Sequence, residues 1–246
     1  MPDTTYYPYL GSGKIYARVA GARAGVLPRG NASELELAVK DEKKTLKDYT
    51  KPGGGTYASV SRIDTVMAKM KLHDLNKTNV ARAVFGTEAA VAGAAVIDEV
   101  VTAYKGALVP LAHPGPTAVV VTNSAATTTY VANVDYELSA GGIVIIDTGA
   151  ILDAQSLKVD YTFAAYSKVE GMTTGAVTLE LHFEGLNEAN SGKPVILDVW
   201  RAQLSPTKAL ALLGDKFSEI DVEAEVLKDP SKTGAGISQY FRVKMA

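Results

Sequence analysis

Apolar and polar residues alternate along residues 57–72, most regularly near the end, where Lys69, Met70, Lys71 and Leu72 follow one another. This period of two is the pattern of a β-strand with one buried face and one solvent-facing face. A strand of this length needs neighbouring strands to pair with. The stretch therefore predicts a sheet around which the rest of the chain is organised.

The period changes directly after this strand. Asn76 is a residue type that caps helices, Val80, Val84 and Phe85 fall on one side of a helix, and Gly86 can close its end. These residues predict a short amphipathic helix that follows the long strand.

Similar alternation occurs at several other places in the chain, outside residues 113–166. Each place predicts a further strand, at residues 14–19, 33–39, 94–103, 177–186, 195–204, 217–227 and 240–245. Residues 21–31 and 231–238 are predicted loops, and residues 207–213 are a predicted helical turn.

Residues 40–55 carry many charges around only two larger apolar side chains, Leu46 and Tyr49, and end in the sequence KPGGG. We predict a long loop here. Such loops inside compact domains are usually binding segments or disordered ones. The segment has too little apolar surface to order itself, so we expect it to be mobile in a lone subunit.

The composition shifts near Ala112. Residues 113–166 are rich in Val, Thr, Ile and Tyr, have few Lys or Arg, and contain frequent turn signals. We interpret this segment as a small β module inserted into a discontinuous core domain of residues 1–112 and 167–246. Its predicted strands are residues 119–122, 128–131, 136–138, 143–146 and 157–163.

Length, charge and cysteine content narrow the possible functions. The 246-residue chain is long enough to bury a substantial core, and its formal net charge of −2 argues against general affinity for nucleic acid. The absence of cysteine excludes disulfides and thiolate metal sites, and it fits synthesis in a reducing cytoplasm. No run approaches the roughly 20 apolar residues that cross a bilayer. The first residues do not resemble a signal peptide, so we expect the protein to stay where it is synthesised.

Candidate chemistry is sparse. The sequence GSGK at residues 11–14 lacks the flanking residues of a phosphate-binding loop, because Pro8 and Ile15 stand where Gly and Ser or Thr are needed. His73, His113 and His182 have no metal-ligand spacing, and we interpret them as ordinary surface or satisfied histidines.

Five acidic residues of the module could in principle surround a calcium ion. They lack the EF-hand spacing, and turn formation explains them more simply: Asp135, Glu137, Asp147, Asp153 and Asp160. Because no nucleophile, base or metal set emerges, we expect neither an enzyme nor a bound cofactor.

The order of these features resembles the major tail tube proteins of long-tailed, siphovirus-like bacteriophages. The resemblance rests on the early strand, the charged loop ending at residues 51–55, the long strand, and the sequence ARAVFG at residues 81–86. It continues with FEGLN at residues 183–187, Ser205-Pro206 and the sequence KDP at residues 228–230. It covers most of the chain.

The resemblance implies a mainly β fold, namely a tail-tube-type β-sandwich or barrel with a short α-helix, plus the inserted β module. It implies a structural virion protein whose six-membered rings each contribute to a continuous β-barrel and stack into the channel for DNA. Ring closure would remove exposed sheet edges, and stacking would be an open-ended heterologous contact. The implied partners are other copies of the chain, a tape-measure protein, and tail terminator and tip proteins. Double-stranded DNA would pass through without specific binding, and the protein would reside in the virion tail after assembly in the host cytoplasm.

Within such a tube, the resemblance places residues 40–55 where one ring meets the next. The module would lie outside, because a β unit in the lumen would obstruct DNA. The channel wall should present few basic side chains, because many phosphate contacts would slow the exit of DNA. The candidate residues of the inter-ring stacking loop are Lys43, Lys44, Leu46, Lys47, Tyr49 and Lys51.

Two other interpretations stay open. A ring protein of a contractile injection or secretion system would share the tube fold. A β-rich carbohydrate-binding or adhesion module would be favoured by aromatic side chains on one exposed face of residues 113–166, whereas a stackable ring would favour the tube.

Overall fold

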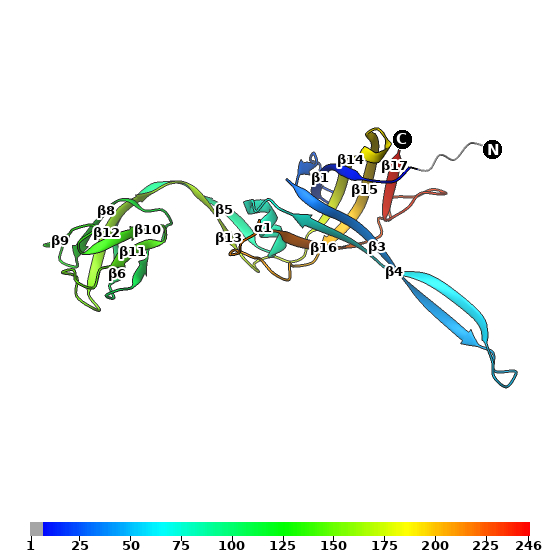
Figure 1. The fold of residues 1–246 in the computed structure, drawn as a ribbon, viewed down its shortest axis with the longest axis horizontal. Helices are drawn as coiled ribbons and strands as arrows, with labels where there is room; N and C mark the ends of the chain where they lie inside the picture. The colour runs from blue at the N-terminus through cyan, green and yellow to red at the C-terminus, as the bar shows by residue number, and fades with distance from the viewer. Residues whose placement is uncertain (1–6) are drawn as a thin grey trace. The chain divides into compact units, whose positions relative to one another are not determined.

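The computed structural model describes residues 7–246 and is mainly β, as the alternating patterns predict (Figure 1). The chain forms two compact units. Unit 1 comprises residues up to 88 together with residues 169–246, and unit 2 comprises residues 89–168. No helix in the described part of the chain is long and apolar enough to span a membrane.

Unit 1 is built on one antiparallel sheet. The strand order is β2-β1-β14-β15-β16-β4-β3, and β17 pairs with β15 beside β16. These strands are β1 (Gly11–Val19), β2 (Leu27–Pro28), β3 (Ala32–Lys47), β4 (Thr56–Leu72), β14 (Thr178–Asn187), β15 (Lys193–Leu204), β16 (Ile220–Val226) and β17 (Phe241–Met245).

The core of unit 1 lies against one face of this sheet. Along β4 the buried residues are Val66, Ala68, Met70 and Leu72, which are the positions that the alternation predicts. They belong to one apolar cluster with side chains from β1, β14, β15 and β16. Full burial of each larger apolar side chain contributes about 1.5–3 kcal/mol, so this face contributes much of the stability of unit 1.

The predicted helix is confirmed as α1 (Lys77–Ala83). Asn76 caps it, because its side-chain oxygen accepts a hydrogen bond from the Asn79 backbone N–H at 2.9 Å. The end differs from the expectation in one detail. Phe85, not Gly86, takes the left-handed conformation, with φ of 49°, while the Gly86 N–H donates to the Ala81 carbonyl at 2.6 Å.

Unit 2 contains two antiparallel sheets, of order β10-β11-β7 and β6-β12-β8-β9. Side chains of both sheets, among them Ile143 and Leu157, form a single buried cluster, so the sheets pack as a small sandwich. The strands are β6 (Ala94–Thr102), β7 (Leu108–Pro110), β8 (Thr117–Asn123), β9 (Thr129–Tyr130), β10 (Tyr136–Ser139), β11 (Gly142–Ile145) and β12 (Ser156–Phe163).

The chain enters and leaves unit 2 through two short strands that pair with each other, β5 (Thr87–Val91) and β13 (Tyr166–Glu170). A 3-10 turn at Glu188–Asn190 joins β14 to β15 in unit 1.

The structure moves the first boundary of the inserted module from residue 113 to residue 89, and its end from residue 166 to residue 168. The reason is that β6 pairs along most of its length with β12, and Val96 and Val101 pack against the core of unit 2. The composition shift near Ala112 marks a change in Lys and Arg content, which does not reveal that pairing.

Two further expectations are wrong. Residues 40–55 are not a long loop, because residues 40–47 belong to β3 and the connecting segment is only residues 48–55. Residues 207–213 form no helical turn, and Thr207 instead donates its N–H to the Ala83 carbonyl at 2.8 Å.

Three of the five acidic residues considered for calcium bind backbone N–H groups at turns and bulges of unit 2. Asp135 is buried, and its carboxylate oxygens accept hydrogen bonds from the backbone N–H groups of Val131 at 2.8 Å and Ala150 at 2.7 Å. These bonds, first that from Val131 and then that from Ala150, lower the pKa of Asp135 below its usual 3.8. Asp153 and Asp160 likewise accept backbone N–H groups, from Lys105 and Asp98.

Deletion of residues 89–168, with a short Gly/Ser bridge from Glu88 to Val169, should leave unit 1 folded, because unit 2 has its own core. Deletion of residues 113–166 should give an aggregating chain, because it removes β12 and leaves the apolar side chains of β6 without a partner. Size-exclusion chromatography and circular dichroism measure both. Equal folding and solubility of the two variants would contradict these boundaries.

Asp135→Asn should destabilise unit 2 by about 1–3 kcal/mol near neutral pH, because an amide nitrogen would then face a backbone donor. Folding lowers the pKa of Asp135, so its carboxylate contributes fully to the free energy of unfolding above pH 3.8. This contribution is lost as the pH falls below 3.8 and past the lowered pKa of the folded state. The difference from wild type in urea unfolding should therefore shrink in acid. Glu137→Gln, at an exposed position of β10, is the matched control, and a difference that is independent of pH would refute the assignment.

Candidate functional site

The most distinctive feature of unit 1 is a two-stranded arm, which we define as residues 40–65. β3 and β4 continue to pair along its length, from Lys40 opposite Thr65 to Lys47 opposite Thr56. β16 pairs with β4 only at residues 67–72, so no third strand of the described chain supports the arm. Figure 1 shows this hairpin projecting beyond the sheet of unit 1.

The sequence closes the arm with a glycine-rich turn. Asp48 Oδ1 accepts hydrogen bonds from Thr50 Oγ1 at 2.5 Å and from the Thr50 N–H at 2.8 Å, and these bonds lower the pKa of Asp48. Gly53 has a positive φ of 85°, and a Cβ on Gly54 would lie 1.9 Å from the Asp48 carbonyl oxygen. The Asp48 N–H donates to the Gly55 carbonyl at 2.8 Å, which returns the chain to β4.

Both faces of the arm carry exposed apolar side chains among polar neighbours. Leu46 lies opposite Ala58, and Lys44 lies opposite Val60, so these four residues share one face. We call Leu46, Ala58 and Val60 the arm patch; Leu46 is 54% exposed and Val60 is 55% exposed. The other face carries the hydroxyl groups of residues 45, 59 and 61, and also Ile63, which is 56% exposed. The arm patch is therefore an apolar surface that the described chain leaves in water.

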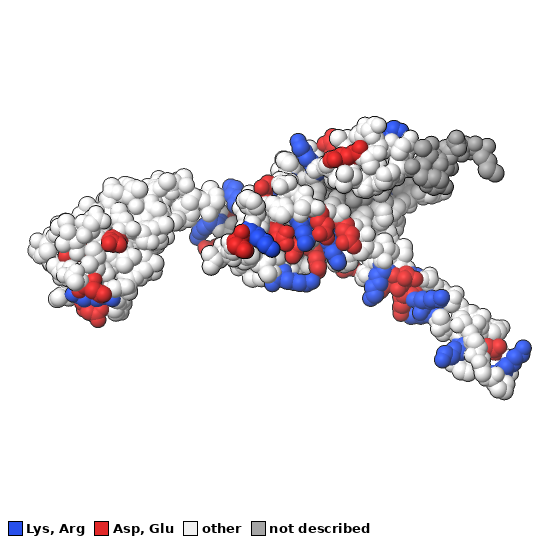
Figure 2. Space-filling model, in the orientation of Figure 1, with Lys and Arg blue, Asp and Glu red and all other residues white. Residues whose placement is uncertain are grey.

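The charges of the arm are mixed in sign. Lys40 pairs with Asp64 at 3.0 Å, and Lys44 lies 3.6 Å from Glu42. Such exposed pairs contribute little to stability. Figure 2 shows blue and red side chains along the arm and over the rest of unit 1, with few charged residues on the visible face of unit 2.

All six residues assigned to the stacking loop lie in the arm and are exposed, but not on one loop. Lys43, Lys44, Leu46 and Lys47 lie on β3, so they alternate between its two faces. The remaining two, Tyr49 and Lys51, lie in the turn, where Tyr49 is 84% exposed. The sequence reasoning missed Ala58 and Val60, although their alternation with Ser59 and Ser61 was a usable signal.

The sheet of unit 1 also has open edges. β3 ends the strand order and pairs only with β4. β1 pairs with β2 only at Tyr16 and Ala17, and the Ile15 carbonyl accepts the Arg29 N–H, which leaves residues 11–14 with β14 alone. Unpaired strand edges present backbone N–H and C=O groups that can accept a further strand.

An apolar hollow of about 570 Å³ lies between these edge strands, and we call it the edge hollow. Its lining includes Ile15 of β1, Leu35 and Leu37 of β3, Phe183 of β14, Leu197 of β15 and Val243 of β17. The Phe183 ring fits there because two residues that pair across the strands, Gly13 and Gly185, have no side chains. A Cβ on Gly185 would lie 2.3 Å from the ring, and a Cβ on Gly13 would lie 2.8 Å from it. The ring therefore covers the backbone of both strands.

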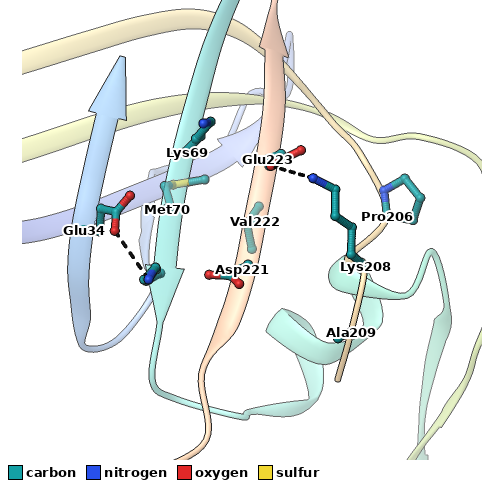
Figure 3. A pocket seen from close by; sticks show the side chains of 10 residues that line it. Glu34, Lys69, Met70, Pro206, Lys208, Ala209, Asp221, Val222 and Glu223 are labelled. Carbon is teal, nitrogen blue, oxygen red and sulfur yellow. Dashed lines mark hydrogen bonds and ion pairs between the residues drawn. The ribbon is translucent and has the colours of Figure 1, made fainter. Parts of the chain in front are cut away.

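A second hollow, of about 250 Å³, lies on the charged face of β3, β4 and β16 (Figure 3). Lys71 lies 3.7 Å from Glu34, and Lys208 lies 3.0 Å from Glu223, as the dashed line in Figure 3 marks. Opposite charges alternate across the three strands, so they largely neutralise one another. This arrangement is that of a solvated sheet face.

The histidines serve separate local contacts. His73 Nε2 lies 2.8 Å from Ser33 Oγ, and the His113 ring stacks on Phe163 with ring centres 3.8 Å apart. His182 Nδ1 lies 2.7 Å from Asp198 Oδ1. Within residues 7–246 no three His, Asp or Glu side chains are grouped to hold a metal ion. Residues 11–14 lie in β1 with no helix after them, so they form no phosphate-binding loop.

Asp198 is the most heavily paired carboxylate of unit 1. Burial alone would raise its pKa, but hydrogen bonds from Lys244 and His182 outweigh burial and lower it. Lys244 Nζ lies 2.9 Å from Asp198 Oδ2, so this contact connects β17 to β15 and adds to their backbone pairing.

Comparison with known protein families places the chain in a family without an assigned function. A family described as "Protein of unknown function UCP028589" matches residues 8–244, which is nearly the whole chain. Comparison with curated proteins finds no match.

Gly185→Val should displace the Phe183 ring and lower the free energy of unfolding of unit 1 by about 1–3 kcal/mol, the usual cost of overpacking. Trp200, the only tryptophan, lies in β15 and reports on unit 1. Gly25→Val is the control, because a Cβ there meets nothing within 4 Å, and its effect should stay within about 0.5 kcal/mol. Equal denaturation midpoints for the two variants would show that the ring does not require the glycine.

Proposed function

The chain belongs to the family described as protein of unknown function UCP028589, and we propose that it is the major tail tube subunit of a long-tailed bacteriophage. In this proposal, subunits form six-membered rings, and the rings stack into a tube through which double-stranded DNA passes. The protein acts through its surfaces, without catalysis or a cofactor. The observation that carries the proposal is the arm, a long hairpin with an exposed apolar patch and no supporting strand.

The physical argument begins with the arm. A two-stranded hairpin is only marginally stable by itself in water. Leu46 and Val60 contribute no hydrophobic stabilisation while they stay exposed. A neighbouring subunit that covered the arm patch would bury these side chains and fix the hairpin. The mixed charges beside them would set the register of that contact more than its strength.

The open edges support the ring. A strand or edge of a neighbouring copy beside β1 or β3 would pair the exposed backbone groups and cover the edge hollow. In a closed ring, the strand edges of every copy are paired in the same way. Contacts of the arm along the ring axis form no closed set, so they add ring after ring and lead to a tube.

Other parts of the chain fit a passive tube. The net charge of −2 suits a channel that releases DNA, and we propose that few basic side chains line it. Unit 2 would lie outside the lumen. The further partners of the proposed tube are a tape-measure protein and the terminator and tip proteins of the tail, and the protein would reside in the virion after assembly in the host cytoplasm.

Of the two alternatives, the carbohydrate-binding module receives less support, whereas the injection-system ring is distinguished only by its surroundings in particles. A carbohydrate-binding module would use aromatic rings on an exposed face, and among the larger exposed apolar side chains of unit 2 only Tyr104 is aromatic. A ring of a contractile injection or secretion system would share the assembly surfaces argued above. An outer sheath around the tube in particles would favour that alternative.

Negative-stain microscopy and size measurement over a range of concentrations test the proposal. The wild-type protein should form six-fold rings and tubes. Removal of residues 40–65 should keep unit 1 folded but abolish tubes, because Val39 and Val66 lie opposite each other and a two-residue Asn-Gly turn can join them. Tubes of normal length from this variant would show that stacking does not need the arm.

Point substitutions sharpen the same test. The double variant with Leu46→Ser and Val60→Ser should form far fewer tubes. Each buried apolar side chain contributes about 1.5–3 kcal/mol, so the affinity of each contact between rings should fall by more than about tenfold. Thr45→Ser with Ser59→Ala, on the opposite face of the arm, is the matched control and should assemble normally. A wild-type protein that stays monomeric and forms no ring in particles would overturn the proposal.

A further inference from the structure

Two arginine side chains reach the core of unit 1, independently of the surfaces discussed above. Arg29, between β2 and β3, is only 6% exposed, and its Nη2 donates a hydrogen bond to the Ala17 carbonyl at 2.9 Å. Its Nε is buried and has no hydrogen-bond partner among residues 7–246. Arg82, on α1, has a buried Nη1 that also lacks a partner within this range.

Arg29 and Arg82 both line the same small cavity, of about 20 Å³. The rest of its lining is mostly apolar and includes Met70, Leu181 and Val222 of the core cluster. A cavity of this volume holds about one water-sized occupant. It is too small for a phosphate, a sulfate or an inserted carboxylate side chain.

The electrostatics of this cavity are unfavourable without an occupant. Burial, and then the like charge of Arg82, lowers the pKa of Arg29 to about 10. Burial also lowers the pKa of Arg82, and the charge of Glu88 opposes this change. Glu88 is exposed, and its Oε2 accepts a hydrogen bond from Thr78 Oγ1 at 3.0 Å. Each unpaired buried donor on a charged group carries a large desolvation cost.

We propose that the cavity between Arg29 and Arg82 binds a single small monovalent anion of the halide class, with chloride as the occupant under physiological conditions. The ion would accept hydrogen bonds from Arg29 Nε and Arg82 Nη1 and offset the repulsion between the two cations. A water molecule could accept both bonds but would leave the repulsion in place. Arg82 is partly exposed, which gives an ion a route to the cavity.

Such an ion would fasten α1 to the core. Arg82 belongs to α1, whose Ala81 and Ala83 are buried, and Arg29 belongs to the loop that leads into β3. Asn79 of α1 already donates a hydrogen bond to the Arg29 carbonyl at 2.9 Å. The anion would add a second connection between the same two segments, so its binding should appear as added stability of unit 1.

Thermal unfolding of the full chain, followed by Trp200 fluorescence, tests this at constant ionic strength with chloride exchanged for gluconate. Chloride should raise the Tm in a saturating manner by about 2–4 °C, because a ligand that binds only the folded state stabilises it. Bromide should act like chloride, whereas sulfate should show no saturation. Arg82→Gln keeps a hydrogen-bond donor but removes the repulsion, so it should abolish the chloride dependence. Exposed Arg23→Gln should retain it.

Chloride-35 nuclear magnetic resonance gives a second measurement that does not depend on stability. The wild-type protein should broaden the chloride signal, bromide should reverse the broadening, and Arg82→Gln should broaden it less than Arg23→Gln does. The proposal is overturned if the wild-type Tm is the same in chloride and gluconate, or if Arg82→Gln responds to chloride as the wild type does. Chloride broadening that bromide does not reverse would equally exclude a specific site.

Discussion

Antiparallel pairing between β3 and β4 is the interaction on which the rest of unit 1 depends. At one end, residues 67–72 of β4 pair with β3 on one side and β16 on the other, so Ala68 and Met70 lie in the middle of the core. At the other end the same two strands continue as the arm. One continuous pairing thus fixes both parts. A shift of register by one residue would turn the core side chains of β4 outward.

Unit 2 shows how an insertion can leave the host fold intact. Its two sheets enclose their own apolar cluster, and β12 lies in the centre between β6 and β8. The irregular register of β12 is accommodated locally, where Asp98 has a φ of 58° and its N–H donates to Asp160 at 2.6 Å. The chain therefore needs only two short paired strands, β5 and β13, to enter and leave the unit.

Three features of unit 1 lack a partner within the described chain. Their sizes indicate two different kinds of partner. The open strand edges with the edge hollow, and the arm patch, are wide surfaces of backbone groups and apolar side chains. In the proposed tube, neighbouring subunits cover these surfaces. The cavity between Arg29 and Arg82 is small and lined by two cationic side chains, so a single ion suits it. The two proposals thus rest on one physical demand, that exposed apolar surface and buried polar groups find partners: other subunits in one place and a single ion in the other.

The sequence by itself determined the strands with a buried face, because alternation is a local record of burial: Met70 and Leu72 were identifiable without coordinates. It also determined the cap of α1, since Asn76 and Asn79 are three residues apart. The contact role of Leu46 and Tyr49 came from the resemblance to tail tube proteins and stays a prediction. Only the tertiary structure decided that residues 40–47 are a strand and that β6 belongs to unit 2. Both depend on backbone hydrogen bonds to partners far along the chain, and such bonds leave no pattern in the side chains of one strand.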